Sequence, residues 1–304
     1  MKNGFADMRG AYAALFTPFD EKDRVNPDAI ARIVEYGLAN GLRGFYLTGT
    51  TGEWWLMSVE ERMAVYDAAA AANRGRGKLI AHVGANRTED AVALARHAAD
   101  VGADWISAVV PPLYSTSFEA TCRHYAAIAS ATDLPFLAYS FTSALVPARD
   151  ARIFDIPNVK GMKYTGRDYY AAQTLKRALD KETLWFAGCD EQLLCALSLG
   201  DVFSGGIGIN YNIIPRHFAD ICRLAAAGDF AGAAARQAEA NRLVELLLEP
   251  ENWTYRKAFM RFVGIDCGPY RMPFGPITEA EYAAWAKRIA ALGFIRENQA
   301  LEIG

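Results

Sequence analysis

Residues 44–84 read GFYLTGTTGEWWLMSVEERMAVYDAAAAANRGRGKLIAHVG, and this stretch decides the fold. It begins and ends with short apolar runs, Gly44–Thr48 and Leu79–Gly84, which have the composition of strands buried on both faces. The segment between them, Ser58–Asn73, predicts a helix, because Glu61 stands three residues after a serine and completes a capping box. Two buried strands joined by a helix predict a parallel pair.

The same alternation continues on both sides of this stretch. Apolar runs predict strands at 11–16, 44–48, 79–84, 104–110, 135–139, 159–163, 183–187 and 202–207. Helical runs follow them at 27–40, 58–73, 88–101, 117–131, 147–154, 168–180, 191–199 and 215–227. Eight such units predict an α/β fold closed into a (β/α)8 barrel, the TIM-barrel architecture. An open, doubly wound sheet is the alternative, which the absence of a GxGxxG motif after the first strand disfavours.

The end of the chain departs from this alternation. Residues 229–295 hold three more helical runs with no strand between them. We therefore expect a catalytic barrel at 1–228 and a C-terminal helical extension at 229–304 that packs on it.

Composition excludes several classes of function. The chain has 304 residues, 52% apolar content and a net charge of -3, which allows a large core and offers nucleic acid no basic patch. No apolar stretch is long enough for a membrane span, and the N-terminus lacks a signal-peptide core. Five scattered cysteines without a CxxC pair predict a reduced, cytoplasmic protein. Four histidines without zinc-ligand spacing give no reason to expect a metal.

The chemically unusual residues share one location, the C-terminal ends of the predicted strands. In this barrel class the active site lies at that end. The segments concerned are GTTGE at 49–53, PPLY at 111–114, Tyr139, Lys163, GCDE at 188–191 and GGIG at 205–208. Their shared placement predicts a site at the mouth of the barrel.

Lys163 is the most informative of these residues. It lies in VKGMKYT at 159–165, which reads as a buried strand. Burial removes water from an ammonium group and lowers its pKa toward neutrality, so that the amine can attack a carbonyl and form a Schiff base. The alternative is a lysine at a strand end with its head in solvent.

The other segments also allow two interpretations. GTTGE offers hydroxyl and backbone N–H groups that suit a carboxylate, or it is only a tight turn. Tyr139 is a proton donor and acceptor, or a core aromatic. Asp190 and Glu191 accept hydrogen bonds from a hydroxylated substrate, or they charge the start of a helix. Gly205–Gly208 leaves room for a ligand, or it is a close-packed strand.

At these residues the chain resembles the pyruvate-dependent class I aldolases typified by dihydrodipicolinate synthase and N-acetylneuraminate lyase. The resemblance covers about residues 10–293, and its motifs are GTTGE at 49–53, Tyr139, GMKYT at 161–165, GCDE at 188–191, GGIG at 205–208 with Tyr211-Asn212 after it, and PFGP at 273–276. AHVGA at 81–85, GCDEQLL at 188–194 and PFGP look like the N-acetylneuraminate lyase branch. The synthase branch usually has an arginine where this chain has Ala144, which disfavours synthase activity.

Two positions depart from the family pattern. Ser140-Phe141-Thr142 replaces the usual proline-containing turn after the tyrosine, and Ile209 stands where the lyase branch usually has a serine. Both border the part of the site that holds the second carbonyl partner. We expect pyruvate chemistry to survive, while sialic acid as the natural substrate is put in doubt.

The resemblance implies specific roles for the matched residues. Lys163 would attack the C2 ketone of pyruvate or another 2-keto acid, and Thr50 and Thr51 would bind its carboxylate. Tyr139 would relay protons, and Tyr114 matches a second relay tyrosine that usually crosses from a neighbouring subunit, so a homotetramer is expected. The iminium is the electron sink, so no metal or organic cofactor is needed. The residues expected along the sugar-like tail are Thr165, Gly188, Asp190, Glu191 and Gly208.

The implied activity is that of a lyase that cleaves a hydroxylated 2-keto sugar acid to pyruvate and an aldehyde. Three alternatives remain. A dehydratase or aldolase for 2-keto-3-deoxy sugar acids would use the same lysine with a different tail pocket. Dihydrodipicolinate synthase activity is the second. The third is a barrel that binds a keto acid without turnover.

Overall fold

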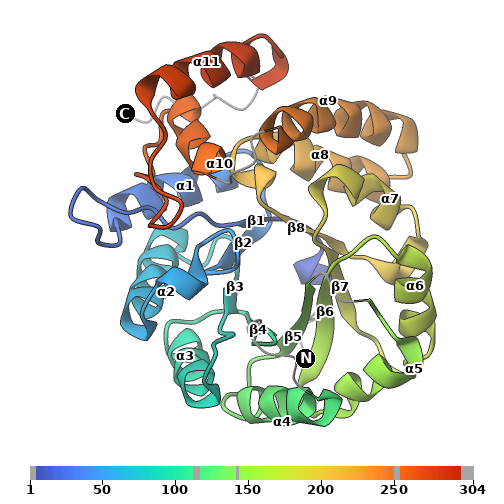
Figure 1. Cartoon of the computed structure of the whole chain (residues 1–304). Helices are drawn as coiled ribbons and strands as arrows, with labels where there is room; N and C mark the ends of the chain where they lie inside the picture. The colour runs from blue at the N-terminus through green and yellow to red at the C-terminus, as the bar shows by residue number, and fades with distance from the viewer. Residues whose placement is uncertain (1–4, 112–116, 142–143, 250–253, 296–304) are drawn as a thin grey trace.

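Eight parallel strands form a closed barrel in chain order (Figure 1). The computed structural model describes residues 5–111, 117–141, 144–249 and 254–295. The strands are β1 (Gly10–Ala14), β2 (Gly44–Leu47), β3 (Lys78–His82), β4 (Trp105–Val109), β5 (Phe136–Phe141), β6 (Val159–Thr165), β7 (Leu184–Ala187) and β8 (Gly205–Gly208). Pairing of β1 with β8 closes the ring. The (β/α)8 barrel expected from the sequence is confirmed, and the open sheet is wrong.

Helices follow the strands and surround the barrel (Figure 1). Asn26 caps the first helix and Ser58 forms the expected capping box with Glu61, so both predicted starts are confirmed. The ring consists of α1 (Pro27–Ala39), α2 (Val59–Asn73), α3 (Thr88–Asp100), α4 (Phe118–Ala129), α5 (Pro147–Asp150), α6 (Tyr169–Arg177), α7 (Leu193–Leu197) and α8 (Pro215–Ala226).

In the α5 and α7 regions, part of each predicted helix is a 3-10 turn. The run predicted at 147–154 is α5 followed by a 3-10 turn at Ala151–Asp155. The run predicted at 191–199 begins as a 3-10 turn at Asp190–Gln192 before α7. Asp190 does not cap this turn, because its carboxylate accepts hydrogen bonds from Asn210 instead.

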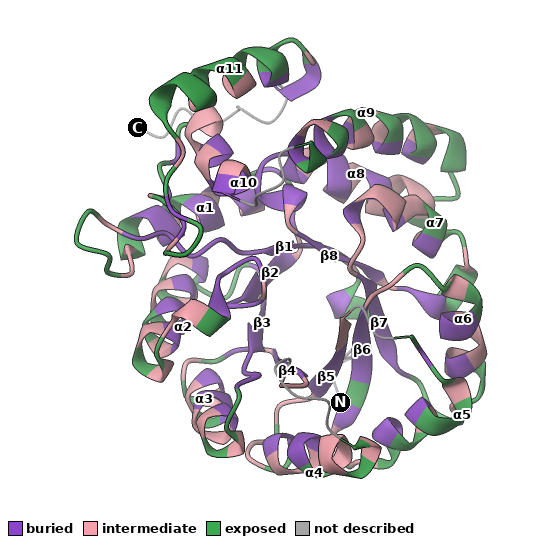
Figure 2. Ribbon diagram, viewed as in Figure 1, coloured by how far each residue is buried: buried purple, intermediate pink, exposed green. Residues whose placement is uncertain are grey.

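Strand alternation divides the core into two layers. Side chains on the outer face of the strands pack against the helices. Figure 2 shows that the helices are buried on the side toward the barrel and exposed on the side away from it. Side chains on the inner face fill the barrel, as is usual for this architecture. The inner layer includes Tyr12, Tyr46, Ile80, Leu137, Tyr139, Leu184, Phe186 and Ile207.

The pairing of β5 with β6 contains a one-residue irregularity. Phe136 pairs with Val159 but Leu137 pairs with Gly161, so Lys160 is left without a partner in the register and is exposed. Above this point the pairing is regular and sets Tyr139 beside Lys163. The irregularity accommodates the extra residue, so the pairing is regular from Leu137 with Gly161 to the C-terminal ends of both strands.

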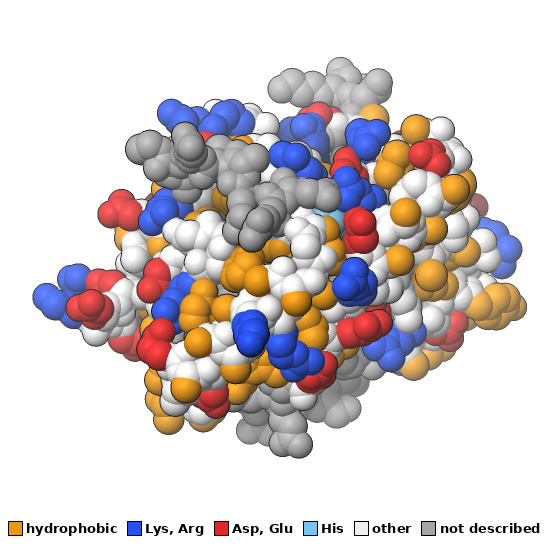
Figure 3. All heavy atoms as spheres, turned by 90° about the horizontal axis from the view of Figure 1, so that it is seen from above, with side chains coloured by type: hydrophobic (Ala, Val, Ile, Leu, Met, Phe, Trp, Pro, Cys, Tyr) orange, Lys and Arg blue, Asp and Glu red, His pale blue; other side chains and the backbone are white. Residues whose placement is uncertain are grey.

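Beyond the ring lie α9 (Phe230–Leu248), α10 (Thr254–Ala258), a 3-10 turn at Phe259–Val263 and α11 (Glu279–Ala290). α9 packs along α8, while α10 and α11 lie outside the ring near α1 (Figure 1). The division of the chain at 228/229 stays a prediction. On the face in Figure 3, basic and acidic side chains are interspersed. Within the described ranges, no helix is long and apolar enough to cross a membrane.

Candidate active site

Lys163 lies inside the barrel on β6 and is only 4% exposed. Its Nζ is 4.2 Å from the ring centroids of both Tyr46 and Tyr139. Among the described residues no carboxylate forms an ion pair with it. Burial lowers the pKa of Lys163 to about 7, and the charges of Asp190 and Cys189 oppose this shift only in part. A sizeable fraction of the amine is therefore uncharged near neutral pH and able to act as a nucleophile.

Tyr139 is the neighbour of Lys163 on the adjacent strand. The two residues are directly paired between β5 and β6, and Tyr139 is 3% exposed. Burial raises the pKa of Tyr139 to about 12, although the nearby hydroxyls of Thr165 and Thr50 lower it. The phenol therefore keeps its proton at neutral pH and can donate it.

The GTTGE turn follows β2 and reaches the same end of the barrel. Its own backbone bonds are from Gly52 N–H to the Gly49 carbonyl (3.0 Å) and from Glu53 N–H to the Thr50 carbonyl (3.2 Å). In the described part of the chain, the N–H groups of Thr50 and Thr51 donate to no other backbone carbonyl. Because Thr50 also lies beside Tyr139, these donors are placed to hold an anionic group next to Lys163.

Both ends of this turn have left-handed backbone at residues other than glycine. The φ angle is 45° at Thr48 and 59° at Glu53, a conformation that costs about 1–3 kcal/mol and persists only where neighbours enforce it. At the first end, Thr48 Oγ1 donates to the His82 carbonyl (3.0 Å), and the Thr48 carbonyl lies 2.9 Å from His82 Nδ1. Val109 N–H donates to His82 Nε2 (3.3 Å), which assigns the proton to Nδ1. The contacts at Glu53 differ and are described below.

Burial keeps His82 neutral. It lowers the pKa of this imidazole well below its ordinary value, and the positive charges of Arg62 and Lys163 lower it further. Arg62 Nη1 donates to the Gly84 carbonyl (2.8 Å), and the Tyr66 hydroxyl donates to the His82 carbonyl (2.6 Å). His82 is thus a fixed hydrogen-bonding partner for the turn, with both nitrogens in use.

Tyr46, His82 and Ser107 were not expected at this site from the sequence. The Tyr46 hydroxyl lies 3.0 Å from Ser107 Oγ, which donates to the Leu137 carbonyl (2.7 Å), and this fixes the ring that faces Lys163. Each of the three interrupts an apolar strand with one polar group. A single polar residue in an apolar strand was the signal that could have identified them. Without the strand register, however, the sequence does not show whether such a side chain points into the barrel.

Four of the residues expected along the substrate tail, Thr165, Gly188, Asp190 and Gly208, lie close to one another at the ends of β6, β7 and β8. Asp190 is 5% exposed, and its Oδ2 accepts hydrogen bonds from the backbone N–H (2.7 Å) and Nδ2 (2.9 Å) of Asn210. A Cβ atom at Gly188 would lie 1.9 Å from Thr165 Oγ1, and one at Gly208 would lie 2.1 Å from Asp190 Oδ1. Any larger residue at these two positions would require the neighbouring side chain to move.

Polar groups on this side differ in their availability. Thr165 Oγ1 is buried and, within the described residues, forms no hydrogen bond of ordinary geometry. Burial raises the pKa of Asp190 to about 6. Glu191 is already engaged, because Arg167 Nη2 lies 3.0 Å from its Oε1 at the exposed rim. Among these groups, Thr165 Oγ1 and the second oxygen of Asp190 are the ones left available for a further hydrogen bond.

The predicted second relay tyrosine and the two departures from the family pattern differ in how far the structure describes them. Tyr114 and Thr142 lie outside the described residues, so their predicted roles stay predictions. Phe141 is half-buried and its ring centroid is 5.8 Å from that of Tyr139, which places an apolar group at the mouth. Ile209 is half-buried and packs against the outer core.

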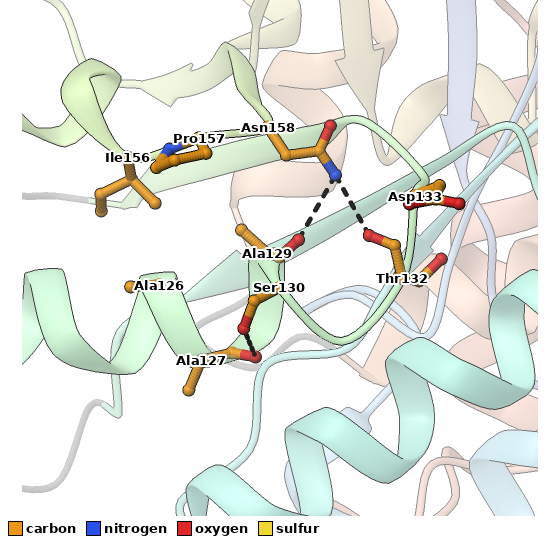
Figure 4. A pocket seen from close by; sticks show the side chains of 9 residues that line it. All are labelled: Ala126, Ala127, Ala129, Ser130, Thr132, Asp133, Ile156, Pro157 and Asn158. Carbon is orange, nitrogen blue, oxygen red and sulfur yellow. Dashed lines mark hydrogen bonds between the residues drawn. The ribbon is translucent and has the colours of Figure 1, made fainter.

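A cavity of about 520 Å³ lies at the other end of the barrel (Figure 4). It is formed by the segments that precede β5 and β6, where Asn158 Nδ2 donates to the carbonyls of Ala129 (3.3 Å) and Thr132 (3.2 Å). Residues at this N-terminal end serve stability in such barrels. The cavity therefore takes no part in the site around Lys163.

Known proteins with similar sequences belong to the family that the motifs resemble. The Dihydrodipicolinate synthetase family matches residues 7–292. N-acetylneuraminate lyase from Rhizobium meliloti strain 1021 is 34% identical over 294 residues, which are 96% of this chain and 97% of that protein.

Two solved structures are also similar over nearly their whole length. A catalytic lysine mutant of the Ruminococcus gnavus sialic acid aldolase superposes with a TM-score of 0.90 at 25% identity, covering 98% of this chain and 99% of that one. N-acetylneuraminate lyase from Fusobacterium nucleatum, complexed with pyruvate, gives 0.86 at 28% identity, covering 94% and 97%.

Proposed function

The chain belongs to the dihydrodipicolinate synthetase family, and from this premise we propose that it is a metal-independent class I pyruvate aldolase. It cleaves a hydroxylated 2-keto acid to pyruvate and an aldehyde. The lyase branch expected from the sequence is supported by N-acetylneuraminate lyases at 33–34% identity. The observation that carries the proposal is Lys163, a buried amine with a pKa of about 7 beside Tyr139.

The first step is formation of the Schiff base. The uncharged Nζ of Lys163 attacks the C2 ketone, and water leaves as the imine forms. The N–H groups and hydroxyls of Thr50 and Thr51 bind the neighbouring carboxylate, which orients the ketone toward the amine. Tyr139, whose phenol keeps its proton, donates to the ketone oxygen so that it leaves as water.

The second step is cleavage. The protonated imine withdraws electrons from the C3–C4 bond when the C4 hydroxyl loses its proton. That bond breaks, the aldehyde leaves, and an enamine remains on Lys163. Protonation at C3 and addition of water release pyruvate and restore the amine. Tyr139 relays the proton from the hydroxyl, since its oxygen lies near both Thr50 and Thr165.

The tail of the substrate is hydroxylated. Thr165 and Asp190 offer it a buried hydroxyl and a carboxylate oxygen. Phe141 adds apolar bulk at the mouth, and Ile209 offers no hydroxyl where the lyase branch usually has a serine. Both features favour a tail other than that of N-acetylneuraminate, such as that of a 2-keto-3-deoxy sugar acid. Ala144 provides no cation for the second carboxylate that a synthase substrate carries.

Two experiments test this function. Incubation with pyruvate and borohydride is expected to add one pyruvyl group per chain, and the absence of an adduct would refute imine chemistry. Comparing kcat/KM for N-acetylneuraminate, 2-keto-3-deoxygluconate, and pyruvate with aspartate semialdehyde identifies the tail. Fastest turnover of the semialdehyde would contradict the lyase assignment, and water loss without cleavage would indicate the dehydratase.

We also propose a cytoplasmic homotetramer. Tyr114 matches a tyrosine that usually reaches a neighbouring subunit's site, and the five cysteines are all free thiols, which fits a reducing compartment. Sedimentation is expected to give a tetramer, and a fully active monomer would refute the role of Tyr114.

A further inference from the structure

The second end of the GTTGE turn is fixed by a buried charge from a distant part of the chain. Glu53 has left-handed backbone and is fully buried. Its Oε1 lies 2.8 Å from Nζ of Lys257 in α10, 204 residues away, and both side chains are 0% exposed. A pair so far from solvent is neither screened by salt nor exchanged for water contacts.

Lys257 is itself held in one position. Its Nζ donates to the Pro269 carbonyl (2.9 Å) and lies 4.4 Å from the ring centroid of Phe19. The other oxygen of Glu53, Oε2, accepts the backbone N–H of Arg271 (2.9 Å). Each carboxylate oxygen of Glu53 therefore has a partner from the segment that follows α9.

The same segment also binds the residues that follow the turn. The Arg271 guanidinium donates to the Leu56 carbonyl (2.9 Å) and pairs with Glu61 at the start of α2 (2.6 Å). The turn is thus confined between β2 on one side and α2 on the other. A change of backbone angle at Glu53 would have to rotate the turn itself, together with the N–H groups of Thr50 and Thr51.

We propose that Lys257 is a positioning residue for the carboxylate-binding turn. It holds Glu53 in the left-handed conformation that aims the donors of Thr50 and Thr51 at the substrate. Recognition of the 2-keto acid's carboxylate then depends on the C-terminal segment, although this segment contributes no group to the reaction. The inference rests on the function proposed above.

A purely stabilising role would look different. A pair that only stabilised the fold would change the unfolding temperature and would affect all substrates equally below it. A pair that aims the turn affects ligands with a carboxylate more than ligands without one, because displacement by about 1 Å can cost on the order of a hundredfold in rate. Pyruvate and its methyl ester, which has the same ketone without the negative charge, separate the two cases.

The experiment measures the rate constant of imine formation at Lys163 by borohydride trapping, with pyruvate and with methyl pyruvate. The variants are Lys257→Met, Glu53→Gln and the double variant. The double variant leaves no buried charge unpaired and is expected to fold, and Glu53→Gln is a second variant that keeps an acceptor for the Arg271 N–H. Arg288→Met is the matched control, because it breaks an ion pair with Glu249 (2.7 Å) remote from the turn.

We expect the ratio of the pyruvate rate to the methyl pyruvate rate to fall about tenfold or more in the double variant and in Glu53→Gln, and to stay unchanged in Arg288→Met. An unchanged ratio in folded Glu53→Gln and double variants would overturn the inference and leave the lyase function intact. No pyruvate adduct on the wild-type protein would instead overturn the lyase function itself.

Discussion

Lys163 and Lys257 are both buried, yet their surroundings differ in the one respect that matters for chemistry. Lys257 has a carboxylate 2.8 Å away and a backbone carbonyl at 2.9 Å. Lys163 faces two aromatic rings and, among the described residues, has no ion-pair partner. Burial lowers the pKa of both, but only at Lys257 does a direct ion pair oppose it.

The difference shows that burial alone does not identify a reactive lysine. A buried ammonium with a counterion keeps its proton and acts as a structural tie. A buried amine without one is most stable when uncharged, and it is then a nucleophile. The aromatic rings around Lys163 exclude water while offering only a weak attraction to its charged form. The surroundings of Lys257 therefore suit a structural ion pair, and those of Lys163 suit a nucleophile.

The largest effect is expected at Lys163 itself. Lys163→Ala removes the nucleophile, so the pyruvate adduct should be absent and cleavage should fall by about 10⁴-fold or more, since the covalent route is lost. Mass spectrometry after borohydride treatment measures the adduct. Lys257→Ala serves as the comparison: it should still form an adduct on the folded fraction. Retention of the adduct by Lys163→Ala would assign the chemistry to another amine.

Tyr139→Phe should have the next largest effect. It keeps the ring beside Lys163 and removes only the hydroxyl, so the fold should hardly change while turnover falls about 10²–10⁴-fold. Steady-state kinetics on the substrate found in the panel, with circular dichroism as the control for folding, measure this. Wild-type turnover in this variant would show that Tyr139 is a core aromatic.

Replacing each lysine by methionine should change stability in opposite directions. Lys257→Met leaves Glu53 buried without its partner and should destabilise the fold by about 3–5 kcal/mol. Lys163→Met removes a poorly solvated charge and should stabilise it by roughly 1–3 kcal/mol near pH 7. Urea unfolding measures both. Equal destabilisation by the two substitutions would contradict the distinction between the lysines.

The gain from Lys163→Met should also depend on pH. The pKa of Lys163 is lowered from 10.5 to about 7 on folding, so the unfolded chain binds more protons between these values and wild-type stability rises with pH there. Below pH 7 both states are protonated and the cost of the buried charge is complete. The stabilisation by methionine should therefore be largest below pH 7 and should shrink toward pH 10. A gain that did not vary with pH would point to packing instead.

The smallest predicted effect concerns the pH dependence of the reaction. Imine formation needs the free amine, so its rate should fall about tenfold per pH unit below 7 and level off above it. Because the charge of Asp190 raises the pKa of Lys163, Asp190→Asn should move this midpoint to lower pH. Trapping rates across pH 5–9 test both points. A midpoint that moved upward would show that Asp190 does not act on the lysine through its charge.

The parts of the molecule that the sequence could predict depend on local patterns. The barrel followed from alternating runs and from caps such as Ser58 with Glu61. The proximity of Lys163 and Tyr139 could be expected because strand ends share one face of the barrel. The tie between Glu53 and Lys257 could not be found this way, because 204 residues separate its members and neither segment is unusual alone. The shortened start of α7 was missed for a similar reason, since Asp190 bonds to Asn210, which follows the neighbouring strand β8.

Gly188 and Gly208, which we propose lie beside the substrate tail, affect how this enzyme should be engineered. A methyl group at Gly188 would fall 1.9 Å from Thr165 Oγ1, and one at Gly208 would fall 2.1 Å from Asp190 Oδ1. Alanine scanning normally reports what a side chain contributes, but at these positions alanine is the larger residue and its failure would report only crowding. A library at either site should rank replacements by volume, whatever their polarity. Making room at Gly188 should therefore begin by shortening Thr165, whereas at Gly208 both Asp190 and the Tyr211 ring (2.4 Å) would have to yield.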